Sequence, residues 1–132
     1  MLFLGCNPTK VDQKGRITIP VKFRKKLENK TLILSKVKVI EKPVIAVFPT
    51  YECAEDMLSS YIDSSDPNYD RNISISVLEC NIDSSNRLNI GKLLEDREEK
   101  EMIAVGRLKN FELWYRSDLE DYCESENLQF HL

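Results

Sequence analysis

The sequence predicts a strand-rich α+β fold assembled from one unit that occurs twice. The motif Asp-x-x-x-Arg at residues 12–16 returns 71 positions later at residues 83–87. After each copy come a short apolar alternation, a helix signal, two apolar strands and a second helix, in the same order. A unit of roughly 50–60 residues buries little core alone, so we expect the copies to interlock with pseudo-two-fold symmetry.

The first motif predicts a tight loop. Asp12 can accept hydrogen bonds from backbone N–H groups two residues on, and Gly15 can take a positive φ without a Cβ clash. Arg16 can then fold back onto the Asp12 carboxylate. Before the loop, residues 2–4 predict a short strand that the following glycine and proline end.

The segment after the loop predicts a strand and a basic helix. Residues 16–19 alternate polar and apolar side chains, as a half-buried strand does. Pro20 suits the first turn of a helix, where its missing N–H costs nothing. Phe23 and Leu27 would form the apolar face of this helix, with cations around the rest.

Two strands and a helix complete the first copy. Residues 32–34 and 44–48 form the strands, and Val37 and Val39 extend the first strand or pair with it. Thr50 can cap the following helix. The apolar face of that helix has helical spacing: Ala54, Met57, Leu58 and Tyr61.

The second copy predicts similar elements. It opens with an alternating strand at residues 73–77 and has a weak helix around residues 92–96. Ser117 and Glu120 form a capping box for the last helix. The apolar face of this helix is Leu119, Tyr122 and Cys123.

The last strands of the two copies predict hairpins of different length. Residues 102–105 correspond to residues 32–34 at the same offset of 71, whereas residues 111–115 correspond to 45–49 at an offset of 66. We therefore expect the second hairpin to be five residues shorter.

These elements divide the chain into four parts. They are a first repeat (1–62), a polar linker (63–72), a second repeat (73–124) and a C-terminal tail (125–132). No run approaches 18 apolar residues, and the N-terminus is too short for a signal peptide, so we expect no membrane partner. The four cysteines are far apart in the sequence, which favours reduced cytosolic thiols over a metal site.

Charge is distributed unevenly along the chain. Residues 1–40 contain ten Lys/Arg and two Asp/Glu, whereas residues 41–132 contain nine Lys/Arg and twenty Asp/Glu. This segregation favours an anionic partner on one face. The alternative is an ordinary solvated charged surface.

Taken together, Asp12-x-Lys14-Gly15-Arg16 followed by Ile-x-Ile-Pro, and Asp83-x-x-x-Arg87 followed by Leu-x-Ile, resemble the twin motifs of the MraZ family. Members are bacterial transcriptional regulators built from two SpoVT/AbrB-type swapped-hairpin repeats. The resemblance implies a double-split β-barrel, a ring-shaped homo-oligomer in the cytoplasm at the nucleoid, and binding to double-stranded DNA. The DNA would be direct repeats upstream of the cell-division and cell-wall gene cluster.

The resemblance also assigns roles to residues. The DNA-facing residues would be Lys14 and Arg16, with Lys22, Arg24 and Lys25 nearby on phosphates. For Arg16, two roles stay open: reaching guanine edges or holding the loop together. The second copy keeps the Asp/Arg pair but loses the basic neighbours, which favours a structural role for the remaining motif residues: Asp12, Gly15, Asp83 and Arg87.

Several questions stay open at this stage. The second copy has Ser85, Asn86 and Gly91 where the first has lysine, glycine and proline, so its contact with DNA is undecided. So are the exact DNA target, activation versus repression, and the subunit number.

Other functions find less support in the sequence. The single histidine, His131, lies near the C-terminus, and no nucleophile–base pair or Gly-rich phosphate loop occurs, so we expect no enzyme, cofactor or small-molecule substrate. The alternatives are an AbrB-like antitoxin and a protein-interaction module. The module would use an acidic stripe: Asp96, Glu98, Glu99 and Glu101.

Overall fold

A computed structural model describes residues 2–132 and confirms a strand-rich α+β fold. The first half contains β1 (Cys6–Lys10), β2 (Arg16–Thr18), α1 (Val21–Arg24), β3 (Thr31–Val39), β4 (Lys42–Phe48), α2 (Tyr51–Met57) and the 3₁₀ turn η1 (Leu58–Ser60). The second contains α3 (Tyr69–Ser76), β5 (Val77–Asn81), β6 (Arg87–Asn89), the 3₁₀ turn η2 (Gly91–Leu93), β7 (Glu101–Arg107), β8 (Asn110–Tyr115) and α4 (Arg116–Ser125).

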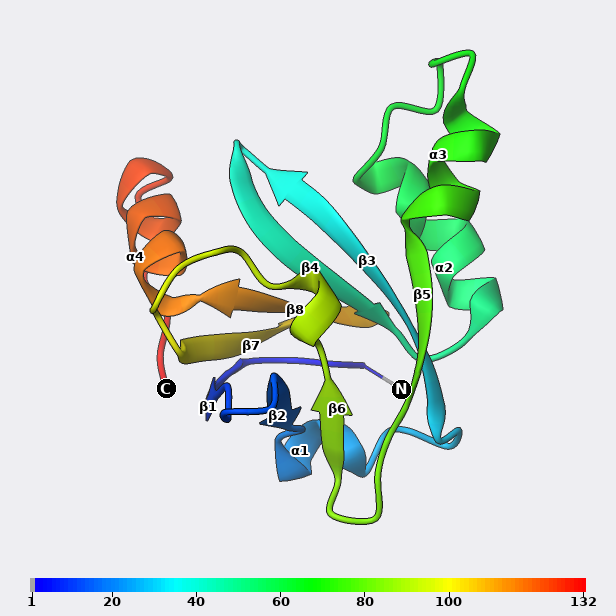
Figure 1. Cartoon of the computed structure of the whole chain (residues 1–132). Helices are drawn as coiled ribbons and strands as arrows, with labels where there is room; N and C mark the ends of the chain where they lie inside the picture. The colour runs from blue at the N-terminus through cyan, green and yellow to red at the C-terminus, as the bar shows by residue number, and fades with distance from the viewer. Residues whose placement is uncertain (1) are drawn as a thin grey trace.

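The strands form a six-stranded antiparallel sheet and a separate two-stranded ribbon (Figure 1). The sheet order is β1-β7-β8-β4-β3-β5, and the ribbon pairs β2 with β6. The counterparts in the two halves are β1 and β5, β3 and β7, and β4 and β8. If each strand is replaced by its counterpart, the same order results, read in the opposite direction. The pairs β1–β7, β3–β5, β4–β8 and β2–β6 all join the two halves. Each half therefore completes the sheet of the other.

Apolar side chains pack on both faces of the sheet. On one face the ribbon and α1 contribute fully buried side chains, among them Ile17, Leu88 and Phe23. On the other face α2 and α4 cover a second cluster that includes Trp114 and Leu119. The expected alternation after the first motif and the apolar faces of α1, α2 and α4 are confirmed, as is the Thr50 cap, whose Oγ1 accepts the Cys53 N–H at 3.0 Å.

The first strand is not at residues 2–4, as the sequence predicts, but at Cys6–Lys10. Pro8 is tolerated because β1 is an edge strand. The N–H groups of Val11 and Gly106 bond to Lys100 and Gly5 carbonyls across the strand pair, which leaves Pro8 in a position that donates no ladder bond.

Residues 73–77 do not form an alternating strand. Most of this segment belongs to α3, and β5 begins only at Val77. A helix directs Ile73 onto the cluster under α2 and α4 but leaves Ile75 82% exposed, so the apolar spacing of two was misleading. The weak helix at residues 92–96 is likewise only the 3₁₀ turn η2.

The second hairpin is shorter than the first by four residues rather than five. Fourteen residues separate the paired Ile33 and Phe48, and ten separate the equivalent pair Ile103 and Trp114. Ile33 and Ile103 belong to the same core cluster, so β7 corresponds to β3 at an offset of 70. The missing residue lies in the connection that precedes β7.

The predicted capping box at the last helix is wrong. α4 begins at Arg116, and the N–H and hydroxyl of Ser117 both donate to the Glu99 carboxylate, at 2.9 and 2.7 Å. Glu120 instead lies 3.8 Å from Arg116. The carboxylate that satisfies the first turn of α4 therefore comes from a distant loop rather than from within the helix.

Candidate nucleic-acid interface

The first motif forms the expected tight loop, which we call loop 1 (residues 12–16). Asp12 Oδ1 accepts the backbone N–H groups of Lys14 at 2.8 Å and Arg16 at 2.9 Å, and Oδ2 accepts Arg16 Nε at 2.9 Å. Gly15 has φ +79°. The Arg16 N–H, followed by its guanidinium and the Lys14 N–H, keeps the pKa of Asp12 below its usual value although desolvation raises it. The carboxylate thus fixes the loop while ionised.

The second motif forms loop 2 (residues 83–87) with almost the same geometry. Asp83 accepts the N–H groups of Ser85 and Arg87 at 2.9 Å and Arg87 Nε at 2.9 Å. Asn86 takes the place of the glycine with φ +60°. The Arg87 N–H is the main cause of the lowered pKa of Asp83, which desolvation opposes. The Asp/Arg pair therefore builds the loop in both halves.

Each arginine nevertheless retains a free edge. Only Nε of Arg16 and of Arg87 bonds to the aspartate, and within residues 2–132 neither guanidinium donates a hydrogen bond through its Nη groups. The two side chains are 24% and 34% exposed. Holding the loop and offering donors outward are therefore compatible roles for the same side chain.

The β2–β6 ribbon brings the two arginines together. Arg16 is paired with Asn89, and Thr18 with Arg87, while the central pair of the ribbon is buried. Because side chains alternate across a strand, these four polar residues share the outer face of the ribbon. A two-stranded ribbon is one of the elements that fit the major groove of B-DNA.

Each loop packs against the other half of the chain. A Cβ built on Gly15 would lie 2.9 Å from Gly91 Cα, and the Ile90 N–H bonds to the Gly15 carbonyl at 2.9 Å. In the same way the Ile19 N–H bonds to the Asn86 carbonyl at 3.0 Å. Loop 1 therefore lies beside η2, and loop 2 lies beside the start of α1.

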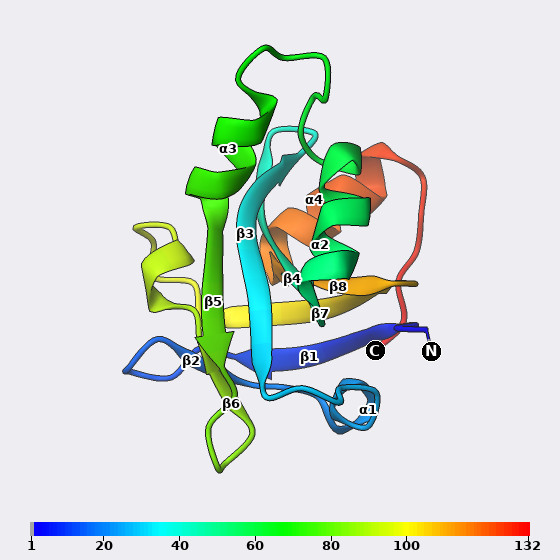
Figure 2. The ribbon, with the colours of Figure 1, turned by 90° about the vertical axis from the view of Figure 1, so that its right-hand side faces the viewer.

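This arrangement separates the cations that the sequence groups together. Figure 2 shows loop 1 at one end of β1 and α1 below the other end. Lys22 Nζ is 3.1 Å from the Cβ position of Gly5, and the Lys26 amino group donates to the Leu2 carbonyl. The structure therefore does not bring Lys22, Arg24 and Lys25 next to Lys14, because α1 crosses to the side of loop 2.

Other lysines flank loop 1 instead. Lys10 ends β1, Lys92 lies in η2, and the Lys100 carbonyl accepts the Val11 N–H at 2.9 Å. No carboxylate of residues 2–132 lies within 4.0 Å of the amino groups of these lysines or of Lys14. Sequence reasoning missed these neighbours because two of them come from the acidic half, and only the strand pairing places them here.

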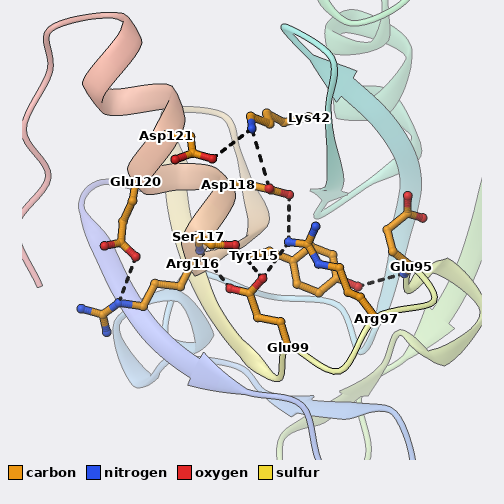
Figure 3. A network of polar contacts seen from close by, with 10 residues as sticks. All are labelled: Lys42, Glu95, Arg97, Glu99, Tyr115, Arg116, Ser117, Asp118, Glu120 and Asp121. Carbon is orange, nitrogen blue, oxygen red and sulfur yellow. Dashed lines mark hydrogen bonds and ion pairs between the residues drawn. The ribbon is translucent and has the colours of Figure 1, made fainter.

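An ion-pair network holds the segment between η2 and β7 (Figure 3). Arg97 bonds to Glu99 at 2.9 Å and to Asp118 of α4 at 3.0 Å, and its guanidinium lies 3.6 Å from the Tyr115 ring centroid. The Glu99 carboxylate also accepts the Ser117 N–H in the first turn of α4, so Glu99 is not part of a free acidic stripe. The network fixes the segment whose last residue is Lys100.

Charge divides between the two ends of the molecule. The unpaired cations described above lie around the loops and α1, whereas α2, α3 and α4 lie toward the opposite end in Figure 1. Residues 51–76 contain six Asp/Glu and one Lys/Arg, and residues 116–132 contain five Asp/Glu and one Lys/Arg. Residues 10–30 contain eight Lys/Arg and two Asp/Glu. The loop end is therefore more basic than the end that carries α2, α3 and α4.

No group of three or more His, Cys, Asp or Glu side chains of residues 2–132 is arranged to hold a metal ion. No helix of the described chain is both long and apolar enough to cross a bilayer.

The chain is similar to known proteins along most of its length. A family model described as "MraZ protein, putative antitoxin-like" matches residues 2–49, which include loop 1 and α1. A protein of Pasteurella multocida named "Transcriptional regulator MraZ" is 32% identical over 133 residues, covering 95% of this chain and 86% of the relative. The chain belongs to the MraZ family. Relatives of the same name in Citrobacter koseri (32% identical, 86% of this chain and 79% of the relative) and Mannheimia succiniciproducens (29%, 95% and 87%) agree with this.

Membership of the MraZ family places the chain among proteins named as transcriptional regulators. The relatives align beyond the family-model region, so the similarity includes loop 2 and the second hairpin as well as loop 1.

Proposed function

We propose that this MraZ-family protein binds double-stranded DNA in a sequence-dependent manner through loop 1, with Lys14 on phosphate and Arg16 on base edges. The observation that carries this proposal is the accumulation of unpaired cations at the loop end of a molecule whose net charge is −3. Lys14 stands exposed at the tip of a loop fixed by Asp12. Arg16 lies on the outer face of the ribbon with both Nη groups free, as bidentate contact with guanine requires.

We further propose the architecture and target that go with this function. The six-stranded sheet and the β2–β6 ribbon correspond to a double-split β-barrel of two repeats, with residues 63–72 as the linker. The target is a set of direct repeats upstream of the cell-division and cell-wall gene cluster, and the protein acts at the nucleoid. A ring of subunits would align several loops along these repeats, which compensates for the few phosphate contacts of one subunit.

The cations of α1 have a different place in this proposal. Lys22, Arg24 and Lys25 lie on the side of loop 2, so they contact phosphates there rather than beside Lys14. Such contacts position the protein on DNA without selecting a sequence.

Two variants in loop 1 test the proposal. Fluorescence anisotropy would compare a duplex carrying the direct repeats with a shuffled duplex at several salt concentrations. Lys14→Gln should weaken binding to both duplexes and reduce the salt slope by about 0.9. Arg16→Gln should reduce the preference for the repeat duplex by about tenfold, the value of one bidentate base contact.

Controls are available within the same chain. Lys38→Gln removes an exposed lysine at the other end of the molecule and should leave binding unchanged. Arg87→Gln measures the contribution of loop 2 separately. Binding of a folded Lys14→Gln/Arg16→Gln double variant at the affinity of the natural chain would rule out loop 1 as the DNA contact.

The alternative of an antitoxin is favoured only by the wording of the family description. Residues 126–132 do not extend from the domain: the Leu128 N–H bonds to the Cys123 carbonyl at 2.7 Å, and Phe130 packs on the core under α4. Co-purification of a toxin partner that requires this segment would support the antitoxin function over the regulator.

A further inference from the structure

A cavity of about 440 Å³ lies on the face of the sheet that α2 and α4 cover, between η1 and α4. Strands β7 and β8 line it with Arg107, Glu112 and Trp114. These side chains share one face, because residues two apart in a strand do so and Glu112 is paired with the residue two before Arg107. Tyr61, after η1, and Tyr122, in α4, line it from the helical side. The size and the aromatic lining are those of a small-molecule site.

A buried carboxylate orients the aromatic side chains of this cavity. Glu112 Oε2 accepts the Tyr61 hydroxyl at 2.6 Å, and Oε1 accepts Trp114 Nε1 at 2.9 Å. Burial, followed by the nearby Glu112 carboxylate, raises the pKa of Tyr61, so the phenol stays protonated and donates. The ring centroids of Trp114 and Tyr122 are 5.0 Å apart. The rings are therefore held in place without a ligand.

Arg107 has a guanidinium that is fixed on one side and free on the other. Nη1 donates to Ser60 Oγ at 2.9 Å, and Nε lies 4.0 Å from Glu112 Oε2. The guanidinium carbon lies 4.5 Å from the Tyr61 ring centroid. The side chain is 37% exposed, and within residues 2–132 Nη2 donates no hydrogen bond. Such a free guanidinium edge matches the geometry of a carboxylate or phosphate group.

The first half of the chain has no such polar group at the corresponding positions. β7 corresponds to β3 at an offset of 70, and β8 corresponds to β4 at an offset of 66. Three polar residues of the second half therefore stand where the first half has buried apolar ones: Arg107 for Val37, Asn110 for Val44 and Glu112 for Ala46. Well-packed apolar residues are often as stabilising as a buried ion pair, so stability alone does not account for this exchange.

We propose that this cavity binds a small aromatic anion, which is an aromatic ring carrying a carboxylate or phosphate group. The ring packs among Tyr61, Trp114 and Tyr122, and the anionic group accepts hydrogen bonds from the free edge of Arg107. The Glu112 side chain is 8% exposed against 37% for Arg107, so an entering anion meets the guanidinium before the carboxylate. This inference goes beyond the DNA-binding function proposed above and does not depend on it.

Three probes with the same ring and different charge test the proposal on the full chain: naphthoate, naphthylmethanol and naphthylmethylammonium. Trp114 is the single tryptophan, so labelling with fluorotryptophan gives one fluorine NMR signal that reports on the cavity. Naphthoate should shift this signal saturably. In calorimetry it should bind about tenfold more tightly than naphthylmethanol, the value of one hydrogen bond to a charged group, and naphthylmethylammonium should bind most weakly.

Variants separate the charge from the rings. Arg107→Gln should remove the preference for naphthoate over naphthylmethanol, and Arg107→Lys should retain part of it. Tyr122→Leu should weaken all three probes alike, by about twofold to tenfold, because it removes one aromatic contact. Arg116→Gln is the matched control, since Arg116 is 40% exposed and does not line the cavity, and it should change nothing. Circular dichroism checks that each variant is folded.

The outcomes decide the inference independently of loop 1. If folded Arg107→Gln binds naphthoate as the natural chain does, or if naphthylmethylammonium binds most tightly, the assignment to an anion is overturned. If no probe shifts the Trp114 signal, the cavity is not a site for aromatic ligands. Loss of DNA binding in the Lys14→Gln variant concerns the proposed function alone and leaves this result unchanged.

Discussion

Replacing Arg97 with methionine removes the guanidinium at the centre of the network in Figure 3 and keeps most of the apolar stem. The Asp118 side chain is 10% exposed and accepts from Arg97 at 3.0 Å, while its other cation, Lys42, is 4.0 Å away. The Arg97 side chain is 30% exposed. Exposed pairs contribute up to about 1 kcal/mol, and breaking a buried pair costs about 3–5 kcal/mol, so we expect a loss of about 2–3 kcal/mol.

Calorimetry and urea denaturation measure this loss. For a chain of this size, the expected decrease in Tm is roughly 8–12 °C. Arg116→Met is the matched control, because Arg116 is 40% exposed and its one ion pair within residues 2–132, with Glu120, spans 3.8 Å. That variant should cost under about 0.5 kcal/mol. Equal losses for the two variants would refute the argument that partial burial of Asp118 makes the Arg97 contact matter.

Two further predictions concern loop 1 and the response to pH. Gly15→Ala should lower the free energy of unfolding, measured by urea denaturation, by about 2 kcal/mol, because φ is +79° and the new Cβ would lie 2.9 Å from Gly91 Cα. Asn86→Gly, at φ +60°, should leave the free energy of unfolding unchanged. A larger loss for Asn86→Gly than for Gly15→Ala would contradict this argument from backbone strain. Partial burial raises the pKa of Glu99, but bonds from the first turn of α4 and from the neighbouring guanidinium outweigh it and lower the pKa below the ordinary 4.5. The Glu99 contribution to stability is therefore complete above pH 4.5 and disappears as the pH falls through the lowered value, and Glu99→Gln should flatten the acid side of the stability curve.

The sequence by itself determined the local chemistry of this protein. The order Asp-x-x-x-Arg places an acceptor four residues before a guanidinium, and a residue that tolerates positive φ lies between them, so each loop closes on its own. The same local logic gave the Thr50 cap and the apolar faces of the helices. The prediction from local pattern was wrong at residues 73–77. The two isoleucines there are two positions apart, but only Ile73 packs against the core and Ile75 is exposed, so the segment can be a helix.

The tertiary structure alone decided which charges share a surface. Strands β1 and β5 pair with the opposite half, and each loop contacts the helix start of the other, so α1 lies beside loop 2 although it directly follows loop 1 in sequence. For the same reason Lys100, in an acidic segment, lies beside Val11 at the start of loop 1. Local patterns cannot reveal such neighbours, because hydrogen bonding between distant strands, and not sequence distance, sets the separation of side chains in a sheet.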